Sequence, residues 1–184
     1  NTIQLTWRAR LEDHLGTFTV EMLQARAAAL IADRKRLYLS QLVCEHLHLL
    51  PERDPHDRLL AMALDLLDNE PDGAALARFE LTLLDELGFG LDLDSCALTG
   101  VTTDLTHVSP RSGRAVSRAA AEPYADRLLP LPSFLTGPGN AAPQDIAAAF
   151  RLSGHFLRTH VWEPRRLAPP PTRDSLIELL TADD

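Results

Sequence analysis

The chain has 184 residues, of which 45% are hydrophobic and 24% charged, a composition that supports one ordinary core and a chain that stays in solution. The sequence contains no run of about 18 apolar residues, so it predicts no membrane span, and it shows no charged-then-apolar leader. Its two cysteines, Cys44 and Cys96, are far apart and do not suggest a disulfide framework. A reducing, cytoplasmic compartment fits best.

The net charge of −8 is unevenly distributed along the chain. Residues 37–104 carry three bases and fourteen acids, whereas the segments before and after them are slightly basic. Because an acidic surface repels phosphate, any contact with nucleic acid is expected outside this middle segment.

The first half of the chain predicts a strand pair followed by helices. Residues 1–22 alternate apolar and polar side chains from Ile3 to Trp7 and then become β-prone, which predicts two strands. Residues 25–50 predict one long helix, or two helices with a break near Asp33.

Two further helices are predicted before the midpoint. One begins at Asp54 and has a single apolar face. The next covers residues 74–87, with Asp72 as its N-cap and Gly88 and Gly90 supplying the left-handed turn that ends it. The apolar face of the first of these helices consists of Leu59, Met62, Ala63, Leu66 and Leu67.

The second half predicts a small β element and then more helices. A hairpin is expected within residues 102–116 and a short helical piece within 118–128. Residues 130–142 contain three prolines and two glycines and predict a loop. A strong helix is expected over residues 144–162, followed by a last helix that Thr172 caps.

The segment CALTG, residues 96–100, has the shape of a zinc knuckle without its usual ligands. Cys96 is followed three residues later by Thr99, and the matching second turn offers Ser117 and Ala120. Structural zinc needs four ligands in a tetrahedron, and one thiolate does not replace four, even if His107 points inward. A metal-free hairpin is therefore expected here.

A second group with metal-ligating side chains is Cys44 with His48, one helical turn apart, and His46 nearby. Two ligands do not make a site, and leucines surround them. Cys44 is interpreted as a core residue and the histidines as surface residues.

The sequence shows no enzymatic signature. It has no phosphate-binding glycine loop, nucleophile elbow or HExxH zinc motif. Acid pairs such as Asp92 with Asp94 fall at turns or helix starts, where carboxylates normally cap backbone amides. The chain is expected to be neither an enzyme nor a cofactor-binding protein.

A basic and aromatic stripe marks the helix predicted over residues 144–162. Arg151, His155, Arg158 and Trp162 recur at helical spacing, and Arg165 extends the series. Guanidinium groups beside an apolar wall suit an acidic peptide that ends in a hydrophobic residue and a free carboxylate. The alternative is an ordinary solvated face with cations near a helix C-terminus.

Other arginines are candidates for contact with DNA phosphates. Arg8 and Arg10 lie on the predicted strand pair, and Arg111 and Arg114 lie at the predicted hairpin tip. For each of them, solvated surface is the alternative interpretation.

Four stretches together resemble the RecO family of bacterial recombination and DNA-repair mediators: WRARLEDHLGTFTVE, RFELTLLDELGFGLDLDSCALTG, VSPRSGRAVSRA and HFLRTHVWEPRRLAPPP. The resemblance implies that residues 1–22 are the last strands of an N-terminal OB barrel. It implies that residues 23–184 form a mainly α domain, a helical bundle with a degenerate zinc-knuckle hairpin at about 95–118.

The same resemblance implies a non-catalytic mediator that docks on the acidic tail of single-stranded DNA-binding protein and on RecR. Such a protein assists RecA loading and strand annealing, contacts single-stranded DNA mainly through the barrel, involves no membrane, and is cytoplasmic and nucleoid-associated. The alternative is a helical scaffold that binds RecR only, without contact to the tail or to DNA.

Overall fold

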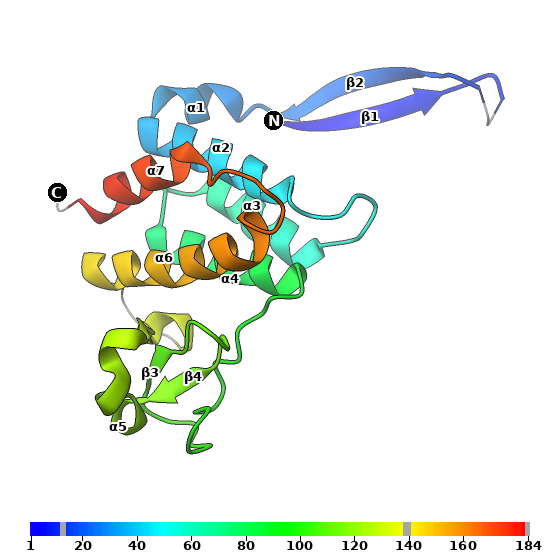
Figure 1. Cartoon of the computed structure of the whole chain (residues 1–184). Helices are drawn as coiled ribbons and strands as arrows, with labels where there is room; N and C mark the ends of the chain where they lie inside the picture. The colour runs from blue at the N-terminus through cyan, green and yellow to red at the C-terminus, as the bar shows by residue number, and fades with distance from the viewer. Residues whose placement is uncertain (12–13, 138–140, 183–184) are drawn as a thin grey trace.

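The computed structural model describes residues 1–11, 14–137 and 141–182. Over these residues the chain is mainly α, as predicted: a bundle of helices carries a small sheet at one end and a two-stranded hairpin that projects from the other end (Figure 1). No helix of the described residues has the length and apolar character needed to cross a bilayer.

The elements in the first half of the chain are two strands and four helices. They are β1 (Thr2–Arg8), β2 (Thr17–Gln24), α1 (Ala27–Ala32), α2 (Arg34–Leu47), α3 (Asp57–Asp68) and α4 (Gly73–Glu86).

The second half contains three short strands among helices of three kinds. The elements are β3 (Leu105–Val108), β4 (Ala115–Ser117), α5 (Arg118–Ala121), the 3-10 turn η1 (Glu122–Arg127), β5 (Leu129–Pro130), the 3-10 turn η2 (Ser133–Leu135), α6 (Pro143–Leu157), the π-helical turn η3 (Arg158–Trp162) and α7 (Pro171–Thr181).

The projecting hairpin has one apolar and one polar face. Strands β1 and β2 are antiparallel, and residues directly opposite each other share a face. Three apolar pairs result, Ile3 with Met22, Leu5 with Val20 and Trp7 with Phe18, and all six side chains are exposed. The strand pair was predicted, but β2 extends to Gln24, so the boundary expected after residue 22 falls inside a strand.

The predicted helix over residues 25–50 is in fact two helices, the second of the alternatives left open. Asp33 separates α1 from α2 in an extended conformation, and its side chain accepts a hydrogen bond from Arg36 N at 2.7 Å. A carboxylate at this position satisfies an amide that lacks a helical partner, which favours a new start over continuation.

The helices α3 and α4 lie close to their predicted positions. The apolar face of α3 is confirmed, but the helix begins at Asp57 rather than Asp54. Asp72 caps α4 as predicted, accepting from Ala74 N at 2.9 Å. Gly88, with φ of +84°, supplies the left-handed turn by itself. Gly90 does not share that conformation, so its predicted role in the turn was wrong.

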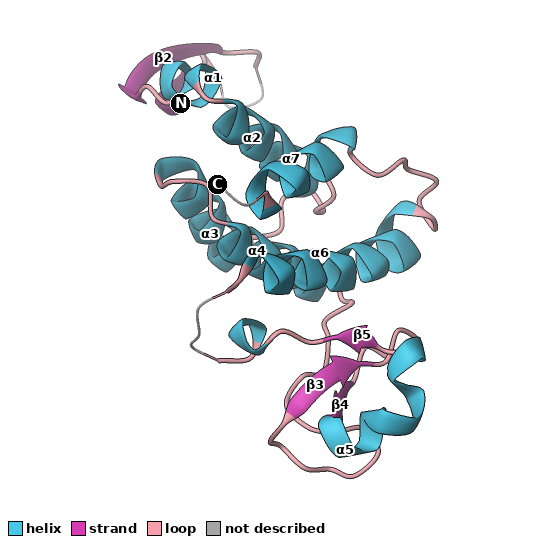
Figure 2. Cartoon of the chain, turned by 90° about the vertical axis from the view of Figure 1, so that its left-hand side faces the viewer, coloured by secondary structure: helices cyan, strands magenta, loops and turns pink. Residues whose placement is uncertain are grey.

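Helix α4 lies at the centre of the bundle and packs against α3, α6 and α7. Its buried stripe includes Leu76, Phe79 and Leu83, none of which is accessible to solvent. Figure 2 shows α4 and α6 side by side. Gly73 at the start of α4 permits this approach, because a Cβ there would lie 2.7 Å from the Ile146 side chain.

The small sheet has the strand order β4-β3-β5 and is antiparallel. The predicted hairpin corresponds to β3 and β4, joined by a turn in which Gly113 has φ of +69°. The strand β5 was not predicted, because Pro130 was assigned to a loop. Pro130 pairs with His107 and lies on an edge strand, where a residue that has no amide hydrogen is tolerated. Residues 138–140 of that loop lie outside the described residues.

Two C-terminal helices, α6 and α7, differ from the prediction: α6 at its C-terminal end and α7 at its N-terminal end. Helix α6 continues into the π-helical turn η3, so the predicted helix over 144–162 is not α-helical throughout. Helix α7 begins at Pro171, and Thr172 is not its cap: the Thr172 hydroxyl donates to Glu45 at 3.2 Å and ties α7 to α2. Proline at the first helical position needs no amide partner, so no side-chain cap is required.

Candidate functional site

A buried ionic network joins four helices in the core of the bundle. The Arg173 guanidinium of α7 donates to both carboxylate oxygens of Glu80 in α4, at 2.8 and 2.9 Å. The Ser153 hydroxyl of α6 also donates to Glu80, and His46 Nε2 of α2 lies 3.1 Å from it. Gly154 leaves room for the guanidinium, since a Cβ there would lie 3.0 Å from its nitrogens.

The charges of this network are matched, so it is structural rather than reactive. Burial of Glu80 raises its pKa, but the Arg173 charge and its hydrogen bonds outweigh burial and hold the pKa well below its usual range. Glu80 therefore stays ionised, and Arg173 stays protonated beside it.

The interpretation of the Cys44 region was wrong for Cys44 and His46 but right for His48, which is exposed. Cys44 is exposed, whereas His46 is fully buried and packs its ring against Phe79 at a centroid distance of 6.3 Å. The partner that makes this burial possible is Glu80, which comes from a distant part of the chain. Across residues 1–11, 14–137 and 141–182, no three His, Cys, Asp or Glu side chains gather in a way that holds a metal.

A groove between α6 and α7 contains most of the predicted peptide-binding residues, and we call it the α6–α7 groove. It has a volume of about 610 Å³ and is lined by Arg151, His155 and Arg158, with Phe150 and Ile177 among the apolar residues of its wall. Arg151 and Arg158 are exposed and form no ion pair with any described residue.

His155 fixes the edge of this groove against the small sheet. Its Nε2 lies 3.0 Å from the carbonyl oxygen of Pro110 in the β3–β4 turn, and its ring meets Phe156 edge-on. The hydrogen bond holds the hairpin tip on α6, so the imidazole has a positioning role as well as a place in the groove wall.

The structure separates Trp162 and Arg165 from the other three residues of the predicted stripe. Trp162 is only 2% exposed and packs edge-on to His46, so it does not belong to an exposed stripe. Arg165 donates to the Leu49 carbonyl oxygen at 2.7 Å on another side of the bundle. The π-helical turn explains the difference, because its wider i→i+5 pattern rotates the residues that follow.

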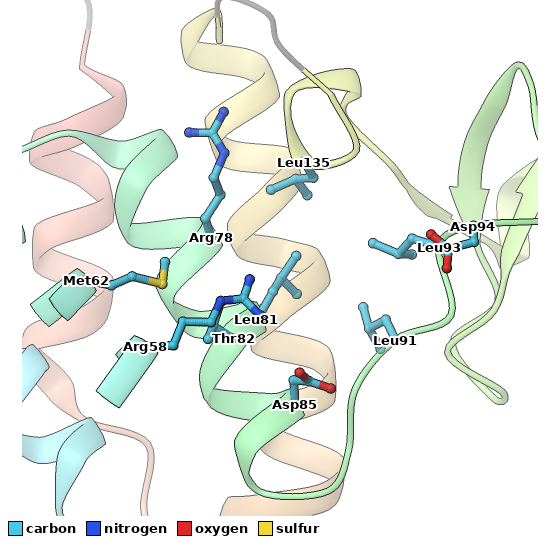
Figure 3. Close-up of a pocket in the computed structure, with 10 residues that line it drawn as sticks. All are labelled: Arg58, Met62, Arg78, Leu81, Thr82, Asp85, Leu91, Leu93, Asp94 and Leu135. Carbon is cyan, nitrogen blue, oxygen red and sulfur yellow. The ribbon is translucent and has the colours of Figure 1, made fainter. Parts of the chain in front are cut away.

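A second pocket lies where the bundle meets the small sheet (Figure 3). It has a volume of about 520 Å³, and the residues around it include Arg58, Arg78, Asp85 and Asp94 together with leucines and Met62. Arg78 is committed to the fold, because it donates to the Phe134 carbonyl oxygen at 3.0 Å and lies over the Phe134 ring. Two carboxylates offset the two cations, so this pocket is less suited to an acidic ligand than the α6–α7 groove.

The four positions of the predicted knuckle, Cys96, Thr99, Ser117 and Ala120, lie close together. Cys96 is buried and accepts hydrogen bonds from the Ser117 amide at 3.3 Å and the Ser117 hydroxyl at 3.5 Å, and Ala120 packs on the same cluster. Threonine, serine and alanine do not replace thiolates around zinc, so these residues do not fit the metal. His107 hydrogen bonds to Thr106 and is not a Cys96 partner.

The Cys96 thiol has an unusual acidity in this surrounding. Burial raises its pKa, but hydrogen bonds from Ser117, Thr99 and the Leu98 amide outweigh burial and lower the pKa to about 6. Hydrogen-bond donors of Ser117, Thr99 and Leu98 thus stabilise the thiolate form of Cys96.

This acidity predicts a pH-dependent contribution of Cys96 to stability. Since the folded-state pKa is depressed, the thiolate stabilises the fold above the ordinary thiol pKa of 9.0, and that contribution is lost as the pH falls through about 6. Denaturant unfolding of the wild type and of Cys96→Ser should therefore diverge progressively as the pH rises from 6 to 9. The exposed Cys44→Ser is the control, and a pH-independent difference for Cys96→Ser would contradict the assignment.

The comparisons with known proteins agree on one family. The family model described as "Recombination protein O C terminal" matches residues 31–167. A DNA repair protein RecO from Chelativorans sp. (strain BNC1) is 52% identical over 180 residues, which cover 94% of this chain and 72% of that protein. The chain belongs to the RecO family.

Other RecO proteins show the same level of similarity. The one from Sinorhizobium medicae is 49% identical over 96% of this chain and 73% of its own length, and the one from Mesorhizobium japonicum is 48% identical over 98% and 74%. No solved structure gives a significant match to the chain. The resemblance to the RecO family found in the sequence is therefore confirmed, and the chain is a DNA repair protein that acts in recombination.

The four arginines considered for DNA contact fall into two separate places in this RecO chain. Arg8 and Arg10 are exposed on the projecting hairpin, whereas Arg111 and Arg114 lie on the small sheet at the opposite end of the bundle (Figure 1). Arg114 is paired with Asp92 at 3.1 Å. Arg111 is exposed and has no ion-pair partner among the described residues, so it is the more available cation of the second pair.

Proposed function

We propose that this chain is the part of a recombination mediator that docks on the acidic C-terminal tail of single-stranded DNA-binding protein. The observation that supports it is the α6–α7 groove, where Arg151 and Arg158 stand exposed beside an apolar wall. Membership in the RecO family makes a recombination partner the natural ligand for this groove.

The groove offers two kinds of contact to such a tail. Guanidinium groups form charge-assisted hydrogen bonds with carboxylates, often bidentate, and so suit aspartate side chains and the terminal carboxylate. Ala147 and Ile177 are half-buried and offer an apolar surface for the last side chain of the peptide, whereas Phe150 is only 2% exposed. Asp174, also at the groove, carries the opposite charge and would limit how far the acidic peptide extends toward α7.

Docking on the tail brings the rest of the protein to coated DNA by raising its local concentration there. In this proposal the protein also binds RecR, assists RecA loading and strand annealing, and works in the cytoplasm at the nucleoid. Single-stranded DNA is contacted mainly by a β-barrel that precedes the helices.

The exposed apolar face of the β1–β2 hairpin supports the barrel part of the proposal. Two strands alone are marginal in water, and three apolar cross-strand pairs on one open face call for a covering layer. We propose that the strand pair, predicted as residues 1–22 and extending to Gln24, forms the last strands of an OB barrel, with Arg8 and Arg10 on its surface. The residues after it form the helical domain with its degenerate knuckle.

The docking proposal is tested by titrating a labelled peptide of the acidic tail. Arg151→Glu/Arg158→Glu is expected to weaken binding by at least about tenfold, since hydrogen bonds between charged partners are worth about 1.5–3 kcal/mol each. Both side chains are exposed, so the variant should unfold as the wild type does. Arg58→Glu in the second pocket is the matched charge control and should keep wild-type affinity.

Full affinity in Arg151→Glu/Arg158→Glu would remove the α6–α7 groove as the tail site. The scaffold alternative, binding of RecR only, is favoured by the fourteen acids in residues 37–104, which suit a basic partner surface. It predicts no saturable binding of the tail peptide by the wild type, together with a salt-sensitive complex with RecR.

A further inference from the structure

Three aromatic rings form a stack that runs from the core to the surface between α4, the small sheet and η3. Phe89 lies parallel to His160 with a centroid distance of 5.1 Å and an interplanar angle of 12°. His160 in turn lies parallel to Phe156 at 5.9 Å and 8°. Phe156 is 1% exposed, whereas Phe89 is 37% exposed and forms the outer end of the stack.

The backbone holds Phe89, the outer ring, and His160, the middle ring, in place. Helix α4 ends in a Schellman motif, in which Gly88 N donates to Asp85 O at 2.9 Å and Phe89 N donates to Leu84 O at 2.8 Å. His160 belongs to the π-helical turn η3, a conformation that is rare and frequent at functional sites. The ring positions are therefore set by the fold before any ligand arrives.

A small cavity adjoins the stack, and a positively charged arginine side chain lies at its edge. Its volume is about 200 Å³, and Phe89, Phe156 and His160 line it together with Gly90, Arg111 and Ser112. Pockets for drug-sized ligands begin at about 300 Å³, so this one suits a single planar ring system. Arg111 at its edge is exposed, and no described carboxylate neutralises it, in contrast to Arg114 with its partner Asp92.

We propose that this stack and Arg111 form a base-stacking site for single-stranded DNA on the helical domain itself. An unpaired base places its face on the outer side of the Phe89 ring, which His160 backs from within, and Arg111 contacts the adjoining phosphate. Every base has a π-face, so the site binds without sequence preference, and duplex DNA does not fit because its base faces are already stacked. The inference rests on the proposed function and adds a DNA contact separate from any barrel.

This site explains how an acidic chain contacts nucleic acid at all. Phe89 lies within the acidic segment of residues 37–104, against the expectation that nucleic acid is contacted only outside it, and the Asp85 carboxylate lies beside Gly90. Asp92 is neutralised by Arg114. Stacking supplies affinity that does not depend on a large positive field. One phosphate contact then suffices to orient the strand.

The test measures binding of labelled oligothymidylate to the whole chain by anisotropy over a salt series. Phe89→Ala is expected to weaken binding by about 5-fold to 150-fold, the effect of losing one stacked base, without changing the salt dependence. Phe89→Tyr keeps the ring and should bind as the wild type. Arg111→Ala should reduce the slope of log K against log salt by about 0.7, the value for one phosphate on a single strand.

Photocrosslinking gives a second readout for weak complexes. An oligothymidylate that carries one iododeoxyuridine should crosslink to Phe89, as identified by mass spectrometry. Wild-type affinity in Phe89→Ala, a crosslink confined to other residues, or no binding of single strands by the wild type would each overturn the proposal. The tail peptide should bind Phe89→Ala normally, so a failure here is distinct from a failure of tail docking.

Discussion

Arg173→Ala is expected to lower the free energy of unfolding by about 3–5 kcal/mol, the usual cost of leaving a buried charge without its partner. Glu80 is completely buried, and its two oxygens accept from the Arg173 guanidinium at 2.8 and 2.9 Å. No other described arginine or lysine pairs with Glu80, so removal of Arg173 strands a carboxylate in the core. Denaturant unfolding monitored by circular dichroism measures the loss.

The control for this prediction is an ion pair of similar length at the surface. Arg118 lies 3.2 Å from Asp104, but both side chains are more than half exposed, so Arg118→Ala should change stability by less than about 1 kcal/mol. A similar small effect of Arg173→Ala would show that the network does not hold the four helices together.

The pH dependence of the same network gives an independent check. The pKa of Glu80 is depressed in the folded chain, so its stabilising contribution is present above the ordinary carboxyl pKa of 4.5 and is lost as the pH falls toward the folded-state value. The stability gap between the wild type and Glu80→Gln should therefore shrink below pH 4.5.

The second large effect is expected from Trp162→Ala, which should cost about 3–5 kcal/mol of unfolding free energy through loss of buried surface and the cavity left behind. The indole is 2% exposed, meets His46 edge-on at 6.5 Å and lies under the Arg173 guanidinium at 6.0 Å. Its loss therefore disturbs both the core and the ionic network.

Two comparison variants distinguish a packing role of Trp162 from a surface role. Trp162→Phe keeps an aromatic ring and should recover a large part of the loss. Arg158→Ala, at the exposed start of the same π-helical turn, should change stability by less than about 0.5 kcal/mol. If Trp162→Ala unfolds like the wild type but no longer binds the tail peptide, Trp162 is not a core residue. The exposed stripe predicted from helical spacing would then be correct.

The ionic network also shows which contacts could not be predicted from the sequence. Glu80 follows Phe79 inside an apolar helix, and a single acid in such a stripe indicates a buried partner. The partner, Arg173, is 93 residues away, and periodicity carries no information about a pairing of that kind. The ring stack was hidden for the same reason, since Phe89 and His160 belong to different elements.

The sequence by itself determined the mainly α fold, the cap Asp72, the strand pairs and the RecO family, because these depend on contacts between residues close in the chain or on a long shared pattern. It left open whether the helix breaks near Asp33. Only the tertiary structure decided which residues are buried and which groups meet. It put His46 inside, left Cys44 outside, and turned Trp162 away from Arg151 and Arg158. The physical reason is that burial of a polar group depends on its partner, and a π-helical turn changes the face of every residue beyond it.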